Sequence, residues 1–523
     1  MGFPSNSREG IIGRHGGPSR TSSVKQFTPG FAEPYYFGVF ARAKKNKREP
    51  RREGSAAFKT NQFPQNEIGI GGFDDVLTDR QAGGRCGAGM SGLPAARALA
   101  DYFEQVVVLE RDTLPFVASH RTGIPQGRHT HALLAGGQRA LGDLFPGFEQ
   151  DLTDAGAVPV NAGLDFRFER PGYDPFPVRD LGLVVCAMSR PLIELTVRRR
   201  VEQYNNITIR EHCRVQDLAS SPDGGTVSAI RFENSEARSE TLATDLVVEA
   251  SGRGYLTNSV LESFGRAPPE ETTIGVDITY ATAVFTIPED APTDWKAVIT
   301  FDAPAEGGCA AVLAPLERNR WIVTLVGRHG EKPPADRDGF LAYAQRLRTP
   351  TIYDAIKKAE QLGEIVRFGF PASFRRHFDR LEEFPRGMLP FGDSICRFNP
   401  VYGQGMSVAA QEARLLHEVL QRHAAEPEPL AGLAPAFFRE AATLTETPWA
   451  LAATPDLAHP KAEGQRPEDL DQALEFTEGL FRLASRDAAV HKLFVEVLHL
   501  LKPQSVLRDP DLVERVKALA ART

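Results

Sequence analysis

The sequence is poor in cysteine and contains no long apolar run. Its 523 residues include five cysteines, which are scattered and never spaced as Cys-x-x-Cys: Cys86, Cys186, Cys213, Cys309 and Cys396. An odd, scattered set argues against a disulfide framework or a zinc site, and it predicts a reducing, cytoplasmic setting without a bound metal. No apolar stretch approaches the roughly 20 residues of a membrane-spanning helix. The start of the chain also lacks the apolar segment of a signal peptide.

Negative charge dominates the chain except at its start. The formal net charge is −7, but residues 1–60 contain twelve Lys or Arg and only four Asp or Glu, which leaves the remainder strongly acidic. The basic cluster at 44–52 is typical of a nucleic-acid or targeting patch. We favour a disordered or artefactual leader over residues 1–75, because Ser, Gly and Pro occur throughout it. The acidic remainder predicts no nucleic-acid partner.

The most informative stretch is the Gly-x-Gly-x-x-Gly motif of Gly87, Gly89 and Gly92. A helical run to Phe103 follows, and then an apolar strand that ends in Glu110. Gly87 permits a tight turn, Gly89 removes a side chain where a pyrophosphate approaches the backbone, and Gly92 lets the helix lie close to the sheet. The helix N-terminus favours an anion, and the carboxylate suits the ribose hydroxyls of an adenosine. Together these features predict a dinucleotide-binding unit.

The residues before this motif lack the composition that it requires. A first strand that is buried on both faces is typically a run of Val, Ile or Leu, whereas residues 79–86 are polar and glycine-rich. If the codons for Gly-Gly-Arg-Cys at 83–86 end in T, the same DNA read one base later encodes a run of valines. One interpretation is therefore a frame error in this strand. The alternative is a real but weak first strand, which would weaken cofactor binding.

Two further loops carry residues suited to a bound dinucleotide. Residues 121–134 form a basic loop that contains His129 and His131, and we favour loop histidines near a cofactor over metal ligands. Later in the chain an apolar strand delivers Asp393, and the glycine-rich loop 399–407 leads into a second helix. Two helix N-termini at one place suit a dinucleotide that has a pyrophosphate and a second electron-rich end.

Antiparallel strands are predicted between these segments, and helices after them. The alternating apolar runs that predict strands lie at 207–210, 227–232, 246–250, 276–280, 283–287, 310–313 and 321–326. Such a sheet typically forms the wall of a substrate chamber, although we favour a core role for its aromatics. Residues 428–523 are predicted to be helical. Their apolar stretch 493–501 is expected to dock on the body, and peripheral lipid contact is the alternative.

From about residue 80 to 520 the chain resembles the class A FAD-dependent monooxygenases, typified by para-hydroxybenzoate hydroxylase. The anchors are the first glycine unit with its acid, the helix headed by Arg190, the strand that runs into 250–254, and the segments 392–393 and 400–406. The chain is most similar to the bacterial polyether-type flavin epoxidases. The shared segments are Pro125 to His131, Ser189 to Leu192, Asn399 to Ser407 and Pro448 to Ala453.

The resemblance implies a set of FAD-binding residues. They are Gly87, Gly89, Gly92, Glu110, Arg111, Arg121, Arg190, Val215, Asp393, Pro400, Gly403, Gln404, Gly405 and Met406. Asp393 is expected at the ribityl hydroxyls, Val215 at the adenine, and 403–406 at the pyrimidine edge of the isoalloxazine. Two residues depart from the family pattern near the path of the reductant: Glu249 stands where Asp is more frequent, and Tyr255 where Ser is common.

The resemblance also implies the reaction. NAD(P)H reduces the flavin, O2 adds at C4a, and the distal oxygen of the hydroperoxide passes to a small apolar substrate. An olefinic polyketide, an aromatic or a terpenoid of secondary metabolism is expected, with an epoxide or a hydroxyl as the product. Epoxidation needs no base from the protein. Hydroxylation of a phenol gains from one, and the candidates are His129, His131 and Tyr402.

Three other interpretations use the same fold. A flavin halogenase is rejected because its Trp-x-Trp-x-x-Pro signature is missing, and Trp295, Trp321 and Trp449 are isolated. An FAD-dependent prenyl-lipid-type reductase would need an equally apolar chamber but no oxygen. A degenerate, non-catalytic FAD-fold protein would follow from a ruined first strand. We favour the monooxygenase.

The expected fold is α/β. A Rossmann-like FAD-binding domain (GR2-type) carries an inserted antiparallel β-sheet substrate domain and a C-terminal helical region. The FAD-binding domain is expected in three parts, at 76–180, 181–265 and 376–425. The substrate domain is expected at 266–375, with strands also contributed from 158–185, and the helical region at 426–523.

Overall fold

The computed structural model describes residues 38–43, 87–222, 224–302 and 309–520. Within these ranges a five-stranded sheet, sheet A, forms the nucleotide-binding part in the order β16-β10-β1-β2-β6. Its strands are β16 (Met388–Pro390), β10 (Leu246–Glu249), β1 (Gly38–Ala43), β2 (Phe103–Leu109) and β6 (Ile207–Arg210). The pairs β2–β6 and β10–β16 are parallel, and helix α1 (Gly92–Ala100) directly precedes β2. The predicted α/β fold class is confirmed.

The middle strand of sheet A differs from the prediction. Residues 38–43 belong to the expected leader, yet they form β1, which pairs antiparallel with both β2 and β10. Without a strand between them, β2 and β10 would have buried backbone N–H and C=O groups without hydrogen-bond partners. Pairing with β1 satisfies these groups. The strand predicted directly before Gly87 and the frame error suggested for it fall at 79–86, outside the described residues.

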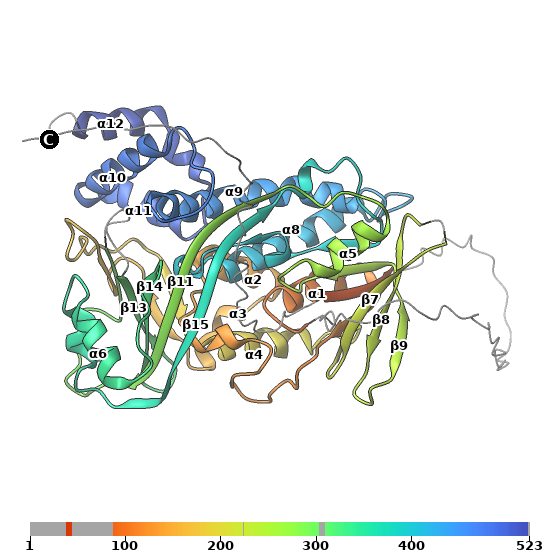
Figure 1. Ribbon diagram of the computed structural model, residues 1–523, viewed down its shortest axis with the longest axis horizontal. Helices are drawn as coiled ribbons and strands as arrows, with labels where there is room; N and C mark the ends of the chain where they lie inside the picture. The colour runs from red at the N-terminus through yellow and green to blue at the C-terminus, as the bar shows by residue number, and fades with distance from the viewer. Residues whose placement is uncertain (1–37, 44–86, 223, 303–308, 521–523) are drawn as a thin grey trace, which may run out of the picture. The chain divides into compact units, whose positions relative to one another are not determined.

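A second sheet, sheet C, has seven strands in the described part of the chain, in the order β17-β15-β11-β14-β13-β12-β4. Their bounds are β17 (Cys396–Arg397), β15 (Gln361–Arg376), β11 (Glu271–Thr286), β14 (Arg320–Arg328), β13 (Cys309–Leu316), β12 (Ala297–Phe301) and β4 (Phe166–Glu169). Figure 1 shows the long strands β11 and β15 side by side. The sequence predicted two strands within β11. The structure has one, because register shifts after Gly275 and Thr282 let it continue.

Alternate residues of sheet C face two different layers. Ala281, Ala283 and Phe285 pack with Phe340 and Tyr343 under helices α6 (Arg337–Gln345) and α7 (Thr351–Ile356). We call this the covered face. On the opposite side a cluster joins the sheet to the C-terminal helices, and its members include Ile278, Tyr280, Val326, Phe370 and Leu457. We call this second side the site face.

The C-terminal region is helical, as predicted. Its helices are α9 (Leu433–Ala458), α10 (Leu470–Arg486), α11 (Ala488–Leu498) and α12 (Pro510–Ala520). In the apolar stretch at 493–501, Phe494 and Val497 are buried in a cluster with Phe176 and Leu480. Docking on the body is therefore confirmed for this stretch. Among the described helices, none has the length and apolar character that crossing a bilayer demands.

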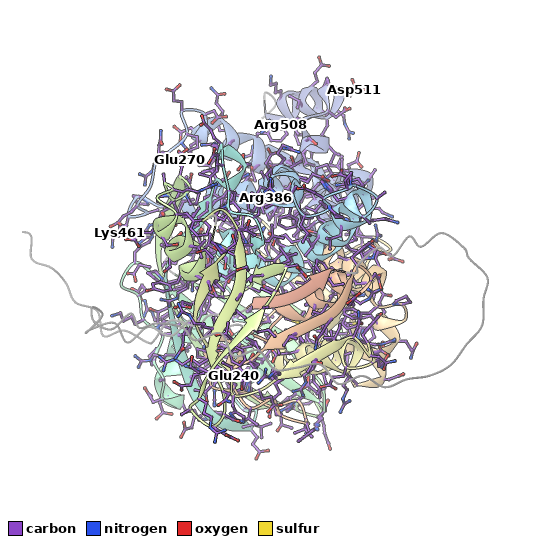
Figure 2. All side chains as sticks on the ribbon, turned by 90° about the vertical axis from the view of Figure 1, so that its right-hand side faces the viewer. Glu240, Glu270, Arg386, Lys461, Arg508 and Asp511 are labelled. Atoms are coloured by element: carbon purple, nitrogen blue, oxygen red, sulfur yellow. The ribbon has the colours of Figure 1, made fainter. Side chains whose placement is uncertain are left out.

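Smaller elements complete the described chain. The other helices nearer the nucleotide-binding part are α2 (Ala135–Leu144), α3 (Phe148–Asp154), α4 (Arg190–Val201), α5 (Tyr255–Ser263) and α8 (Gly405–His423). The strands β3 (Val158–Asn161) and β5 (Val184–Ala187) pair with each other. A three-stranded sheet holds β7 (Arg214–Ser220), β8 (Val227–Glu233) and β9 (Ser239–Ala243). Glu240 of β9, labelled in Figure 2, pairs with Arg210 of β6 at 2.9 Å and so ties this sheet to sheet A.

Candidate functional site

The N-terminus of α1 is open for an anion. Ser91 occupies the N-cap position without a side-chain hydrogen bond, and the first turn contains no acidic residue. A Cβ atom built on Gly89 meets nothing within 4 Å. The backbone N–H groups and the positive end of the helix dipole therefore face free space beside a residue without a side chain, which is the arrangement that a phosphate requires.

Glu110 lies directly beside this turn. Its Oε2 accepts a hydrogen bond from the Ala88 backbone N–H at 2.8 Å, and its Oε1 accepts one from the Asp112 N–H at 2.9 Å. Burial raises the pKa of Glu110 to about 7, although the neighbouring Arg121 opposes the shift. The Cys213 N–H donates to the Glu110 carbonyl at 2.8 Å, which brings the buried Val215 of β7 to the same end of sheet A.

Arg121 and Arg190 are joined by an acid that the sequence analysis missed. Arg121 contacts Glu110 at 3.0 Å and Glu194 at 2.7 Å, and Arg190 contacts Glu194 at 3.0 Å. Arg121 Nη2 also donates to the Ala88 carbonyl at 3.0 Å. The i,i+4 spacing of Arg190 and Glu194 on one helix was the available signal. The structure thus places Arg121 beside the glycine turn and connects Arg190 to it through Glu194.

The second predicted helix begins next to the first. Helix α8 starts at Gly405 without a side-chain cap and without an acid in its first turn. Gly392 has φ +63°, and a Cβ there would lie 2.5 Å from Ser91 Oγ. Asp393 Oδ1 lies 3.7 Å from a Cβ built on Gly405. The loop 392–393 therefore touches the start of α1 on one side and the start of α8 on the other.

Two carboxylates stand at this junction: Asp393 is partly buried and Glu412 is fully buried. Burial raises the pKa of Asp393, and the positive charge of Arg397 partly offsets the shift. Glu412 of α8 accepts a hydrogen bond from the Gly392 N–H at 2.7 Å, and burial raises its pKa to about 8. Glu412 was not among the predicted residues, because its partner is a backbone group twenty residues away. Its role in the structure is to hold the turn that presents Asp393.

One of the two departures from the family pattern, Glu249, has a structural explanation. The buried Glu249 accepts hydrogen bonds from Ser251 Oγ at 2.6 Å, from the Leu256 N–H at 3.2 Å and from the Thr257 N–H at 2.8 Å. It therefore caps the start of α5, where Tyr255 is the first residue. The carboxylate of Glu249 therefore binds backbone N–H groups of the turn that follows its own strand.

The loop 399–403 is fixed by Asp456 of α9. Both Asp456 oxygens accept from Asn399 Nδ2 at 2.9 Å, and Oδ1 also accepts from the Tyr402 hydroxyl at 2.8 Å. Arg328 of β14 lies 3.4 Å from the same carboxylate. Burial raises the pKa of Tyr402. As a base candidate Tyr402 is thus a neutral phenol that is already engaged. After Glu194 and Glu412, Asp456 is the third residue that the sequence analysis missed.

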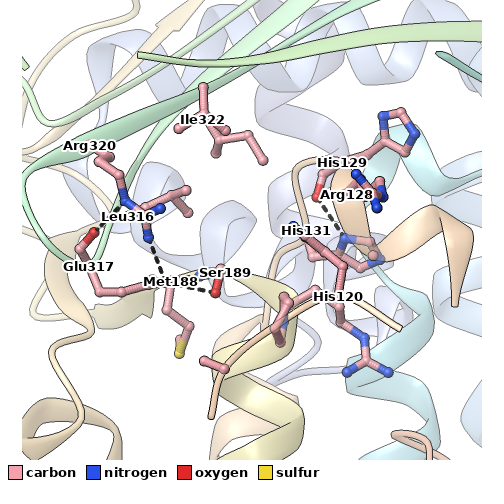
Figure 3. A pocket seen from close by; sticks show the side chains of 15 residues that line it. His120, Arg128, His129, His131, Met188, Ser189, Leu316, Glu317, Arg320 and Ile322 are labelled. Atoms are coloured by element: carbon pink, nitrogen blue, oxygen red, sulfur yellow. Dashed lines mark hydrogen bonds and ion pairs between the residues drawn. The ribbon is translucent and has the colours of Figure 1, made fainter. Parts of the chain in front are cut away.

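The two candidate histidines are held neutral. His129 Nδ1 lies 2.7 Å from Thr282 Oγ1, and His131 Nδ1 lies 2.9 Å from the His129 carbonyl. Burial lowers the pKa of His129 to about 4 and that of His131 to about 3. Figure 3 shows both beside a cavity of about 90 Å³, with Arg320 paired to Glu317 on its other side. In the described ranges no three metal-binding side chains are grouped around a common point.

The remaining predicted residues lie around the same junction or at its edge. Gln404 is buried and its Oε1 has no hydrogen-bond partner in the described part of the chain. A Cβ on Gly403 would be 2.9 Å from Ala132, which joins the loop 399–405 to the histidine loop. Met406 is partly buried against the main core. Pro400 is exposed, and Arg111 is partly exposed beside Asp112.

Comparison with known proteins gives relatives in sequence and in fold. The chain is similar to Protein Rv3254 of Mycobacterium tuberculosis, with 32% identity over 409 residues that cover 72% of this chain and 81% of that protein. It superposes on the flavin-dependent brominase Bmp2 with a TM-score of 0.57, at 14% identity over 79% of this chain and 92% of that one. The p-nitrophenol 4-monooxygenase PnpA from Pseudomonas putida gives a TM-score of 0.56, at 17% identity over 80% and 97%. No model of a protein family matches. The fold is therefore that of flavin-dependent monooxygenases and halogenases.

Proposed function

The chain belongs to the family of Protein Rv3254, and we propose that it is an FAD-dependent monooxygenase that uses NAD(P)H and O2 to oxidise an apolar substrate. The observation that carries the proposal is the meeting of two uncapped helix N-termini. Ser91 at the start of α1 lies against Gly392, and Asp393 lies against Gly405 at the start of α8. A dinucleotide with two electron-rich ends matches this arrangement.

The donor set fits FAD. Open space at Gly89 and the free N–H groups of α1 suit the pyrophosphate. Glu110, at the end of β2, suits the adenosine ribose. Asp393 suits the ribityl hydroxyls, and the start of α8 suits the edge of the ring where negative charge develops. When bound, FAD supplies hydride acceptance from NAD(P)H and activation of O2.

The protein's own task is to orient the substrate and exclude water. The site face of sheet C offers apolar side chains for this, among them Ile278, Val326 and Phe370. Asp456 fixes the loop 399–403 against that face through Asn399 and Tyr402. Burial lowers the pKa of His129 to about 4 and that of His131 to about 3, so both are weak bases, and the Tyr402 hydroxyl is engaged by Asp456. The described residues therefore favour oxygen transfer that needs no protein base, such as epoxidation.

The test is a spectrum followed by a turnover assay. Purified full-length protein is expected to be yellow, to retain FAD, and to oxidise NADPH faster with an apolar substrate that also suppresses peroxide release. Asp393→Ala is expected to lose most of its FAD, whereas Asp217→Ala, an exposed residue of β7 paired with Arg231, is expected to keep it. A colourless protein that cannot be loaded with FAD would overturn the proposal. Substrate turnover without O2 would favour a reductase instead.

A further inference from the structure

Two buried polar atoms on the site face have no hydrogen-bond partner within the described residues. They are Nε2 of His129 and the hydroxyl of Tyr280. The two side chains are 3% and 5% exposed, and their ring centres lie 5.9 Å apart. Native proteins rarely leave such atoms unpaired, because a buried polar group without a partner destabilises the fold.

The surroundings explain why these atoms stay unpaired. Thr282 holds His129 Nδ1, and Thr324 in turn bonds Thr282 at 2.7 Å and Thr130 at 2.8 Å. This chain of hydroxyls fixes the imidazole ring and occupies its other nitrogen. Apolar side chains also pack against the two rings: the ring of Phe368 lies 5.6 Å from that of His129, and Tyr280 packs in the cluster of Ile278 and Val326.

The pair also lies close to the loop that is proposed to face the flavin. Val401 packs against the same apolar cluster as Tyr280. Tyr280 is also within electrostatic range of Arg328, Asp456 and Tyr402, the residues that fix loop 399–403. The unpaired hydroxyl of Tyr280 therefore lies on the same side of sheet C as that loop.

We propose that His129 Nε2 and the Tyr280 hydroxyl form a subsite for one neutral oxygen of an otherwise apolar substrate. A hydroxyl group satisfies both atoms, because it donates to the imidazole nitrogen and accepts from the phenol. The subsite rests on the proposed function and narrows its substrate class to apolar molecules that carry a hydroxyl at one end.

The test compares two probes of nearly equal shape, 2-naphthol and 2-methylnaphthalene, by titration of the purified full-length protein. A plain apolar chamber favours the methyl compound, because desolvating a hydroxyl is costly. The subsite predicts that 2-naphthol binds about tenfold more tightly, which corresponds to about 1.4 kcal/mol. In Tyr280→Phe the preference is expected to fall to one or to reverse.

Tyr343→Phe is the matched control. Tyr343 is equally buried, but it belongs to the covered face, and its hydroxyl donates to the Val326 carbonyl at 3.1 Å. This variant is expected to melt at a lower temperature and to keep the tenfold preference. Tyr280→Phe is expected to melt at or above the wild-type temperature, because it removes a hydroxyl that has no partner.

Each contrary outcome overturns the subsite. Equal binding of the probes, binding of neither, a preference that survives in Tyr280→Phe, or a marked fall in its melting temperature would do so. The measurement requires no turnover and is read beside the FAD content of each sample. A flavoenzyme without the preference therefore overturns only the subsite, whereas a protein that prefers 2-naphthol but cannot be loaded with FAD overturns only the monooxygenase.

Discussion

The two faces of sheet C come from alternate residues of the same strands, yet they differ in how their buried polar atoms are paired. On the covered face, Ala283 and Phe285 of β11 pack under α6, and the buried hydroxyl of Tyr343 has a partner. On the site face, the hydroxyl of Tyr280 on the same strand has no partner among the residues that the structure describes, and Asp456 contacts Asn399, Tyr402 and Arg328. The covered face maximises packing, whereas the site face keeps polar groups that packing alone would not favour.

This difference follows from the period of a strand. Because side chains alternate, one strand can supply a core on one side and a binding wall on the other without a change of backbone. Trp321, Val323 and Leu325 of β14 face the covered side, and Thr324 between them bonds Thr282 and Thr130 on the other side. Mutations on the covered face should therefore act on stability, and mutations on the site face on binding.

The largest effect is expected for Phe340→Ala. This ring is 1% exposed and packs beneath the covered face against Phe285. Truncating it should lower the free energy of unfolding by about 3–5 kcal/mol, measured by urea denaturation, and leave the FAD content of the folded fraction unchanged. Phe368→Ala on the site face is the counterpart: it is only partly buried, so it should cost less stability and weaken 2-naphthol binding. Equal losses from both would remove the distinction between the faces.

Asp456→Asn should have the next largest effect. In the wild type, Asn399 Nδ2 donates to both oxygens of Asp456. An amide at position 456 keeps the shape of the side chain but replaces one of these acceptors with an NH2 group, which cannot accept from Asn399. It also leaves Arg328, which is 12% exposed, without its charge partner. We expect a loss of about 1–3 kcal/mol in unfolding free energy, together with weaker FAD retention, because the loop 399–403 loosens.

Asp217→Asn provides the control for this change. Asp217 also pairs with an arginine, but both partners are about half exposed, so its replacement should cost less than about 1 kcal/mol and leave FAD in place. If Asp456→Asn behaves like Asp217→Asn in both measurements, Asp456 does not hold the loop.

The parts of this molecule that depend on local spacing could be predicted from the sequence. The glycine unit predicts α1, and the Gly-Gln-Gly segment predicts the start of α8. Ser189 is the N-cap of α4, and its hydroxyl accepts a hydrogen bond from the Leu192 N–H at 3.3 Å. The alternation of apolar and polar residues also predicts strands. Each of these features depends on residues a few positions apart, where backbone geometry is set by neighbours in the chain.

Features that depend on distant partners were not predictable. Asp456 accepts a hydrogen bond from Asn399, 57 positions away in the sequence. Glu412 accepts one from the backbone N–H of Gly392. A buried acid in a helix has no local pattern that names its partner. The antiparallel β1 is a similar case, since its place depends on the open position between β2 and β10. The roles of the predicted FAD residues stay predictions, although the structure gathers most of them at one junction.

The pH dependence of stability should separate His129 from the covered face. Burial lowers its pKa to about 4, whereas an unfolded histidine titrates near 6.5. Above pH 6.5 both states are neutral. Between pH 6.5 and 4 only the unfolded state takes up the proton, so stability falls by about 1.4 kcal/mol per pH unit, which is on the order of 2 kcal/mol by pH 5.

His129→Gln removes this contribution. The variant should therefore show a shallower loss of unfolding free energy between pH 6.5 and 5 than the wild type, measured by denaturation at each pH. Other buried histidines such as His491, whose pKa burial lowers to about 4, contribute equally to both proteins and cancel in the comparison. Parallel curves for the two proteins would show that His129 is not held neutral in the fold.

The smallest and sharpest comparison is a reciprocal exchange at two neighbours in β14. Val323 is fully buried on the covered face, and Thr324 is buried on the site face. Val323→Thr places a hydroxyl among apolar groups and should cost about 1–3 kcal/mol. Thr324→Val fits the same space but takes one partner from the hydroxyls of Thr130 and Thr282, so it should also cost about 1–3 kcal/mol. Only Thr324→Val should weaken 2-naphthol binding, because the imidazole of His129 loses its support. A weakened binding in Val323→Thr, or unchanged binding in Thr324→Val, would show that the faces do not divide stability from binding as proposed.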